Sequence, residues 1–186
     1  MKNTDIYVTC PEFDTEHFHL RLVQENDAED LQKCYGNPIA QKYFNSDNCD
    51  SDFHYSTVEE MRACILGWLS EYKQRHYIRF AIVDKLSDTV VGTFEMFGTP
   101  NWKFTNYIDG GCLRLDILPE YEKIEFIQEL LSLADQKFLE LFHVKVMVVK
   151  AIPEAIERRA ALDAVKFMPY ELNSSEFKYF YARVVE

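Results

Sequence analysis

The sequence is poor in the residues and patterns that mark special classes of protein. Glycine and proline number six each among 186 residues, which argues against a disordered or fibrous chain. The five cysteines are scattered, odd in number and without a C-x-x-C pair, as expected in a reducing compartment. No apolar run reaches the roughly 18 residues of a membrane span, and the amino terminus has no apolar signal core. We therefore expect a cytoplasmic protein with no membrane partner.

Basic residues are also in the minority. The chain has 20 Lys and Arg against 31 Asp and Glu, a formal net charge of −11. Because nucleic acids are bound by basic side chains that displace counterions, DNA and RNA are excluded as leading partners. The same charge favours the approach of cationic amines. The length and a hydrophobic content of 47% predict a single domain over residues 1–186.

Hydrophobic periodicity in the first half predicts strands and helices in alternation. Period-two alternation indicates a strand at 17–23, followed by a short helix through 30–34. A long amphipathic helix is expected to end near His76, with a capping box that we assign to Ser56 and Glu59. Two β-rich runs, 77–83 and 90–97, are expected to pair antiparallel. The stretch 98–111 is expected to be irregular.

The second half continues the alternation. We expect a strand at 112–118 closed by Pro119, an amphipathic helix whose apolar positions run from 127 to 142, and a strand at 144–150. Pro153 is expected at the first position of another helix, and 177–185 makes a last strand. The fold class is therefore α/β, or mixed α+β, with a mixed central sheet flanked by helices. Periodicity alone leaves the topology open.

Four sequence blocks resemble, in order, those of one superfamily. The blocks are FHLRLVQENDAEDL at 18–31, FAIVDK with VVGT at 80–93, LPEY at 118–121, and Pro153-Glu154 with Phe167. Together they resemble the GNAT superfamily of N-acetyltransferases, in its ribosomal-protein and spermidine branch, over nearly the whole chain. The resemblance implies the GNAT fold, in which the fourth and fifth strands splay apart to admit the pantetheine arm of acetyl-CoA.

The resemblance also implies where acetyl-CoA would bind. In that superfamily the amides of the pantetheine arm pair with the backbone of the fourth strand, at positions held here by Ile117 and Leu118. The diphosphate lies on N–H groups at the start of the following helix, where orphan donors and the helix dipole favour an anion. The corresponding residues are Lys123, Ile124, Glu125, Phe126 and Ile127.

This loop departs from the superfamily pattern Q/R-x-x-G-x-G/A, whose small residues let phosphate oxygens approach the backbone. Glu122 replaces the basic or amide residue, Glu125 the key glycine, and Ile127 the second small residue. Each carboxylate close to a diphosphate would repel it by about 1 to 4 kcal/mol. Micromolar binding amounts to only about 8 kcal/mol. The alternative is an ordinary helix start, with glutamates complementing the dipole and no phosphate nearby.

The second motif is also altered. Ala155, Arg158 and Lys166 stand where the superfamily has Asn, Ser and Gly, and Leu162 aligns with the tyrosine that many relatives use as general acid. Arg158 and its neighbour Arg159 are candidates to contact the phosphates from the last helix. Alternatively, they form an exposed face paired with acidic residues of the same helix.

The candidate catalytic residues are two strand carboxylates. Acyl transfer to an amine needs a base, direct or through water, and stabilisation of the oxyanion. Members of that superfamily place a carboxylate or an ordered water near this point, so the resemblance makes Glu95 in the strand 90–97 and Asp116 in the strand 112–118 the candidates, each with a solvent-facing strand carboxylate as the alternative. The pair His17 and His19 has no third ligand, so no metal site is predicted.

Two functions remain open. The first is an acetyl-CoA-dependent N-acetyltransferase acting on a primary amine of a small molecule, a polyamine or a protein N-terminus. The second is a catalytically inactive binding or regulatory module that keeps the GNAT fold and has lost acetyl-CoA. A variant of the first holds acyl-CoA through Lys123, Arg158 or Arg159 in place of the glycines. The assembly state is open too, a homodimer included.

Overall fold

A single mixed sheet organises the chain. The computed structural model describes residues 5–47, 49, 51–100, 109–173 and 176–185. Within those ranges eight strands lie in the order β1-β2-β3-β4-β5-β6-β8-β7. Their bounds are β1 Phe13–Asp14, β2 Phe18–Leu22, β3 Ile78–Asp84, β4 Thr89–Pro100, β5 Asp109–Ile117, β6 Val146–Lys150, β7 Met168–Tyr170 and β8 Phe180–Val184.

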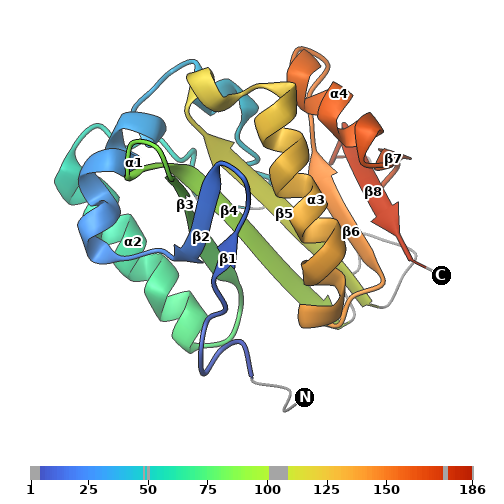
Figure 1. Cartoon of the computed structure of the whole chain (residues 1–186), viewed down its shortest axis with the longest axis horizontal. Coiled ribbons are helices and arrows are strands. Elements are labelled where there is room, and N and C mark those ends of the chain that lie inside the picture. Colours follow the sequence, from blue (N-terminus) through green and yellow to red (C-terminus); the bar gives the residue numbers. More distant parts are fainter. Residues whose placement is uncertain (1–4, 48, 50, 101–108, 174–175, 186) are drawn as a thin grey trace.

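Helices cover both faces of this sheet (Figure 1). The α-helices are α1 Ala28–Tyr35, α2 Val58–Lys73, α3 Ile124–Leu141 and α4 Ile156–Ala164, with short 3-10 helices η1 Glu25–Asp27, η2 Ala40–Tyr43 and η3 Pro119–Tyr121. Helices α1 and α2 pack on one face with Ala81, Val83 and Val90. Helix α3, with α4 beside it, packs on the other face. None of the helices in the described ranges is both long and apolar enough to cross a bilayer.

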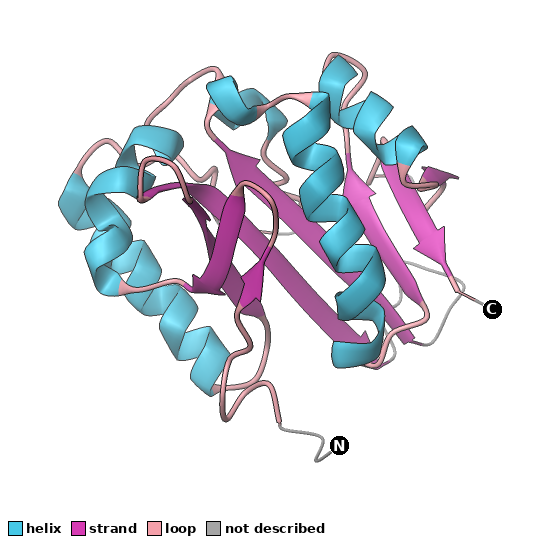
Figure 2. Ribbon diagram, viewed as in Figure 1, coloured by secondary structure: helices cyan, strands magenta, loops and turns pink. Residues whose placement is uncertain are grey.

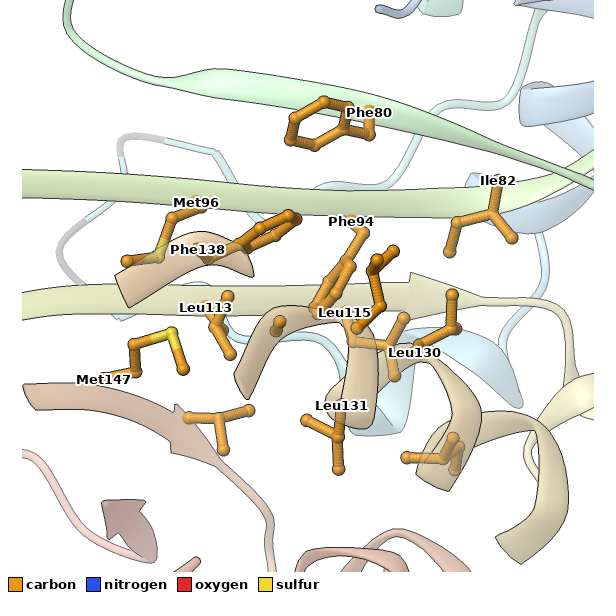
Figure 3. Close-up of a cluster of buried hydrophobic side chains, with 14 of the residues drawn as sticks. Phe80, Ile82, Phe94, Met96, Leu113, Leu115, Leu130, Leu131, Phe138 and Met147 are labelled. Atoms are coloured by element: carbon orange, nitrogen blue, oxygen red, sulfur yellow. The ribbon is translucent and has the colours of Figure 1, made fainter. Parts of the chain in front are cut away.

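The α3 face holds the largest hydrophobic cluster (Figure 3). Phe138 of α3 is at its centre, with its ring centroid 5.5 Å from that of Phe80 and 5.6 Å from that of Phe94. Buried aromatic side chains of this size remove large apolar areas from water, so they dominate the energy of such a layer. This layer fixes α3 against β3 and β4 and thereby positions the loop that precedes the helix.

The strands β5 and β6 part toward their carboxyl ends. They are parallel and paired from Gly110 opposite Val146 to Leu113 opposite Val149, where the pairing stops, although β5 continues to Ile117. In Figure 2 the two arrows are adjacent where they begin and separate toward their heads. The strand gap, as we call this separation beyond Leu113 and Val149, is the splay that the sequence resemblance predicted.

Most expected elements are confirmed, and three of their details were wrong. The capping box of α2 is Thr57 with Glu60, one residue later than expected. The expected pair, Ser56 with Glu59, has the same spacing, so spacing alone does not distinguish the two pairs. Helix α4 begins at Ile156, not at Pro153, because Ala155 has a non-helical backbone (φ −80°, ψ 66°). Helix α2 ends at Lys73, short of the expected end near 76.

The stretch from 98 to 111 is not irregular throughout. Strand β4 extends to Pro100 and β5 begins at Asp109, so the two strands form a longer antiparallel pair than expected. The rest of that stretch, 101–108, lies outside the described residues. The short edge strands β1 and β7 were not predicted, since two and three residues are too few to show a period.

Candidate functional site

A network of buried charged side chains lies on the sheet face that α1 and α2 cover. Its centre is Arg79 of β3, which is only 2% exposed. Its Nε donates to Glu95 Oε2 at 2.9 Å, and Nη2 donates to the same oxygen. Its Nη1 donates to Asp116 Oδ2 at 3.0 Å. The guanidinium carbon also lies 4.1 Å from the ring centroid of Trp68, a cation-π contact that covers the cation.

The two predicted catalytic carboxylates are therefore close together, but their oxygens are used differently. Both oxygens of Glu95 are bonded, Oε2 to Arg79 and Oε1 to Arg114 Nη1 at 3.0 Å. Asp116 uses only Oδ2, which accepts from Tyr35 Oη at 2.7 Å and from Arg79. Asp116 Oδ1 is buried, and within the described part of the chain it has no hydrogen-bond partner. Of the two carboxylates, Asp116 is thus the one with an oxygen that has no partner in the described part of the chain.

The solvent-facing alternative for these carboxylates is wrong. Glu95 and Asp116 are each 1% exposed, because the sheet face to which they point is covered by α1 and α2. The sequence analysis missed their partners Tyr35 and Arg79, and also Thr93, whose hydroxyl bonds both of these. Arg79 did carry a signal, since it is the one charged residue in the otherwise apolar run 77–83, and a buried charge requires partners.

The environment sets the protonation of the network. Burial by itself would lower the pKa of Arg79, but the charges of Glu95 and Asp116 and the Tyr35 phenol outweigh it, so its pKa stays well above the usual value. Burial, and next the neighbouring Asp116, raise the pKa of Tyr35 well above its usual value. Tyr35 consequently stays protonated, and its hydroxyl donates a hydrogen bond to Asp116 Oδ2.

Two more unpartnered polar atoms belong to the same network. Asp47, in the loop after η2, receives a bond from Arg114 Nη2 on its carbonyl oxygen at 3.0 Å and one from Lys150 Nζ on Oδ1 at 2.7 Å. Its Oδ2 and the Nε of Arg114 are buried without a partner among the described residues. Asp116 Oδ1, Asp47 Oδ2 and Arg114 Nε are thus two acceptors and one donor left open in one network beside the strand gap.

The backbone of Ile117 faces the strand gap. Leu118 N–H donates to Val91 O on β4 at 2.9 Å, and successive residues of a strand point their N–H and C=O groups to opposite sides. The N–H and C=O of Ile117 therefore point away from β4, toward the side that β6 has left. Leu118 differs, because its C=O also accepts a bond, from Tyr121 N–H at 2.9 Å.

The start of α3 is occupied by the protein's own groups. Ile124 N–H donates to Glu157 Oε2 of α4 at 2.9 Å, and Ile127 N–H donates to Lys123 O at 3.0 Å. The Lys123 ammonium lies 5.6 Å from the ring centroid of Phe126. Glu125 lies exposed in the first turn, and the Ile127 side chain is buried in the core.

Arg158 of α4 crosses to the segment that follows β5. Its Nε donates to Glu122 Oε1 at 2.8 Å and its Nη2 to Glu122 Oε2 at 2.7 Å, and Nη1 donates to Tyr43 O of η2 at 3.0 Å. Arg158 is 2% exposed, so the expectation of an exposed face was wrong for this residue. Burial by itself would lower its pKa, yet the Glu122 carboxylate raises it. Arg159 instead donates to Tyr181 Oη at 2.9 Å.

The residues present therefore fit one end of a coenzyme A molecule and not the other. The Ile117 backbone offers a donor and an acceptor to the amides of a pantetheine arm. The diphosphate end meets the carboxylates of Glu122 and Glu157, while the cation Arg158 and the Ile124 N–H that could hold a phosphate are already bonded. As the chain stands, a diphosphate does not fit there, since it would meet like charges.

The two histidines of the first predicted strand, His17 and His19, each contact a carboxylate. His17 Nδ1 lies 2.6 Å from Glu129 Oε2, and His19 Nδ1 lies 3.2 Å from Asp14 Oδ1. Across the described ranges, no group of three or more His, Cys, Asp or Glu side chains is arranged to hold a metal ion.

Comparison with known proteins gives matches only at the level of structure. No protein-family model matches the chain, and no curated protein matches it. The ribosomal-protein-S5-alanine acetyltransferase from Vibrio fischeri has a TM-score of 0.69 and 14% identity, covering 94% of this chain and 96% of that one. A GNAT-family acetyltransferase from Bacillus anthracis gives 0.65 and 11%, covering 94% and 98%.

A third solved structure was determined with a coenzyme A derivative. RimJ from Mycobacterium smegmatis, in complex with CoA-disulfide, gives a TM-score of 0.66 and 13% identity, and covers 90% of this chain and 82% of that one. At identities this low the likeness establishes the fold and nothing finer. The chain has the GNAT fold.

Proposed function

We propose that this chain is an N-acetyltransferase that acts on a primary amine, with Asp116 as the carboxylate that receives the amine. The observation that carries the proposal is the free oxygen of Asp116, a buried side chain three residues beyond Leu113, where the backbone pairing between β5 and β6 ends. A primary ammonium group has three N–H donors and no acceptor, so it complements such an oxygen.

The network explains how Asp116 would be positioned. Tyr35 and Arg79 hold Oδ2, so the direction of Oδ1 is fixed before any ligand arrives. Such preorganisation lowers the cost of orienting an amine and of accepting its proton, directly or through water. Glu95 has both oxygens bonded to arginines, and its role is to hold Arg79 and Arg114 in place.

The acetyl donor implied by the fold is acetyl-CoA, which would bring the thioester to the strand gap. Of the residues that the sequence assigned to it, Ile117 supplies backbone groups suited to the pantetheine arm. The other residues remain predicted contacts of the cofactor, because several of their polar groups already have partners within the chain. They are Leu118, Lys123, Ile124, Glu125, Phe126 and Ile127.

Substrate choice is tested with three kinds of primary amine: a short peptide with a free N-terminus, spermidine and glucosamine. Peptides come first, because similar solved structures include an enzyme named for the alanine of a ribosomal protein. With an active amine, Asp116→Asn should reduce kcat by about 10²-fold or more, the usual contribution of a positioned base. An Asp116→Asn enzyme that retains full kcat would contradict the role of Asp116.

Glu95→Gln is the companion variant, and it separates the two carboxylates. It should mainly lower stability, because it weakens bonds to Arg79 and Arg114 within the network. Any folded fraction should keep a kcat well above that of Asp116→Asn. Equal losses of kcat in the two folded variants would contradict the distinction between them.

The second candidate is a binding module that has lost acetyl-CoA. The bidentate pair of Arg158 with Glu122 favours it, together with the Glu157 cap on Ile124 N–H, since both occupy the diphosphate position. A thermal shift with acetyl-CoA separates the two functions. Saturation at 100 times Kd stabilises by about 2.7 kcal/mol, which raises Tm by roughly 5 to 10 °C in a domain of this size. No shift with either acetyl-CoA or pantetheine would support the module.

A further inference from the structure

The Arg158 and Glu122 pair joins the two segments that follow the parted strands. Glu122 comes shortly after β5 and Arg158 lies in α4, which follows β6. The same guanidinium also reaches Tyr43 O of η2, so three separate segments meet at one buried cation. The contact thus joins the segment after β5 to the helix after β6, the two strands whose pairing ends at Leu113 and Val149.

We infer that Arg158 and Glu122 form a latch that closes the diphosphate end of the strand gap in the free chain, and that a phosphate-bearing donor binds only when Glu122 leaves Arg158. This inference rests on the proposed transferase function. The part of the diphosphate misfit that Glu122 causes then belongs to the closed state, while Glu157 keeps its bond to Ile124 N–H.

The first argument is geometric. A guanidinium offers two parallel N–H donors, and a carboxylate or a phosphate accepts them in the same two-pronged arrangement. Glu122 occupies both prongs, Nε and Nη2, at 2.8 and 2.7 Å. The Glu122 carboxylate therefore occupies the place on Arg158 that a phosphate group would take, and the two anions exclude one another.

The second argument concerns which partner moves. Arg158 is anchored on the far side by Nη1, which donates to Tyr43 O at 3.0 Å, and it emerges from the regular helix α4. Glu122 lies between η3 and α3 in a short connection without helical or strand backbone (φ −75°, ψ 63°). Turning Glu122 outward leaves α4 in place and frees two donors of a cation that stays fixed.

The third argument is charge. With Glu122 in place, Arg158 is neutralised, and the exposed Glu125 adds negative charge in the first turn of α3, so an approaching diphosphate is repelled. With Glu122 turned out, the diphosphate gains the Arg158 cation, and Glu122 regains its hydration. The exchange replaces one bidentate pair with another, so it does not leave a buried charge unpaired.

The test compares two probes, coenzyme A and pantetheine, by isothermal titration. Pantetheine has no diphosphate, so the latch should not affect it. Glu122→Gln should tighten the Kd of coenzyme A at least tenfold relative to the unaltered chain and leave the Kd of pantetheine unchanged. The matched control is Asp27→Asn, which weakens a second buried bidentate pair, Arg21 with Asp27, outside the strand gap. It should change neither Kd.

A second measurement uses the unaltered chain, in case Glu122→Gln does not fold. The Nε–H signal of Arg158, observed by proton–nitrogen NMR and assigned by its loss in Arg158→Lys, should shift on addition of coenzyme A at millimolar concentration and not on addition of pantetheine. A signal that stays in place while coenzyme A binds would overturn the latch.

The remaining outcomes of the titrations separate the latch from the transferase proposal. Coenzyme A that binds the unaltered chain and Glu122→Gln with equal Kd overturns the latch and leaves the transferase proposal intact. Pantetheine that binds both proteins while coenzyme A binds neither also overturns the latch. If neither probe binds either protein, the transferase proposal itself fails, and the latch with it.

Discussion

Two buried ionic groups lie beside the parted ends of β5 and β6, and they differ in how completely they are satisfied. In the first, centred on Arg79, Asp116 keeps one oxygen without a partner in the described part of the chain. In the second, Arg158 and Glu122 satisfy one another at both oxygens. Buried polar groups are normally paired, so an open acceptor is a place for a ligand or water, whereas a closed pair is a barrier. The difference assigns binding capacity to the first group and closure to the second.

The largest effect should come from removing the cation of the first group. Arg79→Met leaves two buried carboxylates, Glu95 and Asp116, without their shared partner, so we expect a loss of about 3 to 5 kcal/mol in unfolding free energy. Chemical denaturation measures it. The control is Arg183→Met, which removes a half-exposed pair with Asp135 and should cost about 0 to 1 kcal/mol. Equal losses in the two variants would show that the network is not buried as described.

A smaller loss is expected from the second group. Arg158→Met removes the partner of Glu122, but Glu122 is in a loop connection and can turn to water, so we expect about 1 to 3 kcal/mol, the cost of lost charge-assisted hydrogen bonds. The comparison between Arg79→Met and Arg158→Met thus tests whether the second group can open. If Arg158→Met loses as much unfolding free energy as Arg79→Met, Glu122 cannot turn away from Arg158, and the pair is a permanent structural contact.

The next largest effect on stability is expected from removing the hydrogen bond that orients Asp116. Tyr35→Phe keeps the buried ring and removes a hydroxyl that donates to Asp116 and contacts Thr93. We expect about 1 to 2 kcal/mol of lost stability. If Tyr35 positions Asp116, kcat with the active amine should fall while the Kd of coenzyme A stays the same. A fall in stability with unchanged kcat would assign Tyr35 a structural role alone.

The order of the main elements was predicted from local signals, whereas the strand splay was implied by the resemblance to the GNAT superfamily. Periodicity needs only neighbouring residues, so α3 and the β3 and β4 hairpin were predicted. Competing local signals gave the errors. Ser56 with Glu59 and Thr57 with Glu60 have equal spacing, and only the extended backbone of Thr57 (φ −125°, ψ 157°) identifies the cap.

The charge pairing could not be predicted in the same way. Arg79 meets Glu95 and Asp116, which are 16 and 37 positions away, and Arg158 meets Glu122 over 36 positions. Strand alternation did not help either, because β3 is buried on both faces and a strand of this kind does not show which side faces solvent. The carboxylates were named from the resemblance, but their burial required the packing of α1 and α2.

The smallest effect concerns pH and lies away from both groups, at His17 and Glu129. The hydrogen bond with Glu129 raises the pKa of His17 above its usual 6.5, and this outweighs the opposing effect of burial. A histidine with a raised pKa in the folded state stabilises the fold below the unfolded value, and that stabilisation disappears as pH rises through the folded value. For Glu129, burial would raise the pKa, but bonds from Thr15 and His17 lower it below 4.5, so its contribution is lost as pH falls.

The stabilisation from this pair is therefore fully present between pH 4.5 and 6.5, and it is lost as pH falls through the lowered pKa of Glu129 or rises through the raised pKa of His17. We expect the difference in unfolding free energy between the unaltered chain and His17→Gln to be greatest between pH 4.5 and 6.5 and to disappear as pH rises through the raised pKa of His17, as followed by denaturation at a series of pH values. Since His17 is largely exposed, the difference should be small and should shrink further in high salt. A difference that stays constant across this pH range would show that the imidazole contributes through packing against Phe126 and not through its charge.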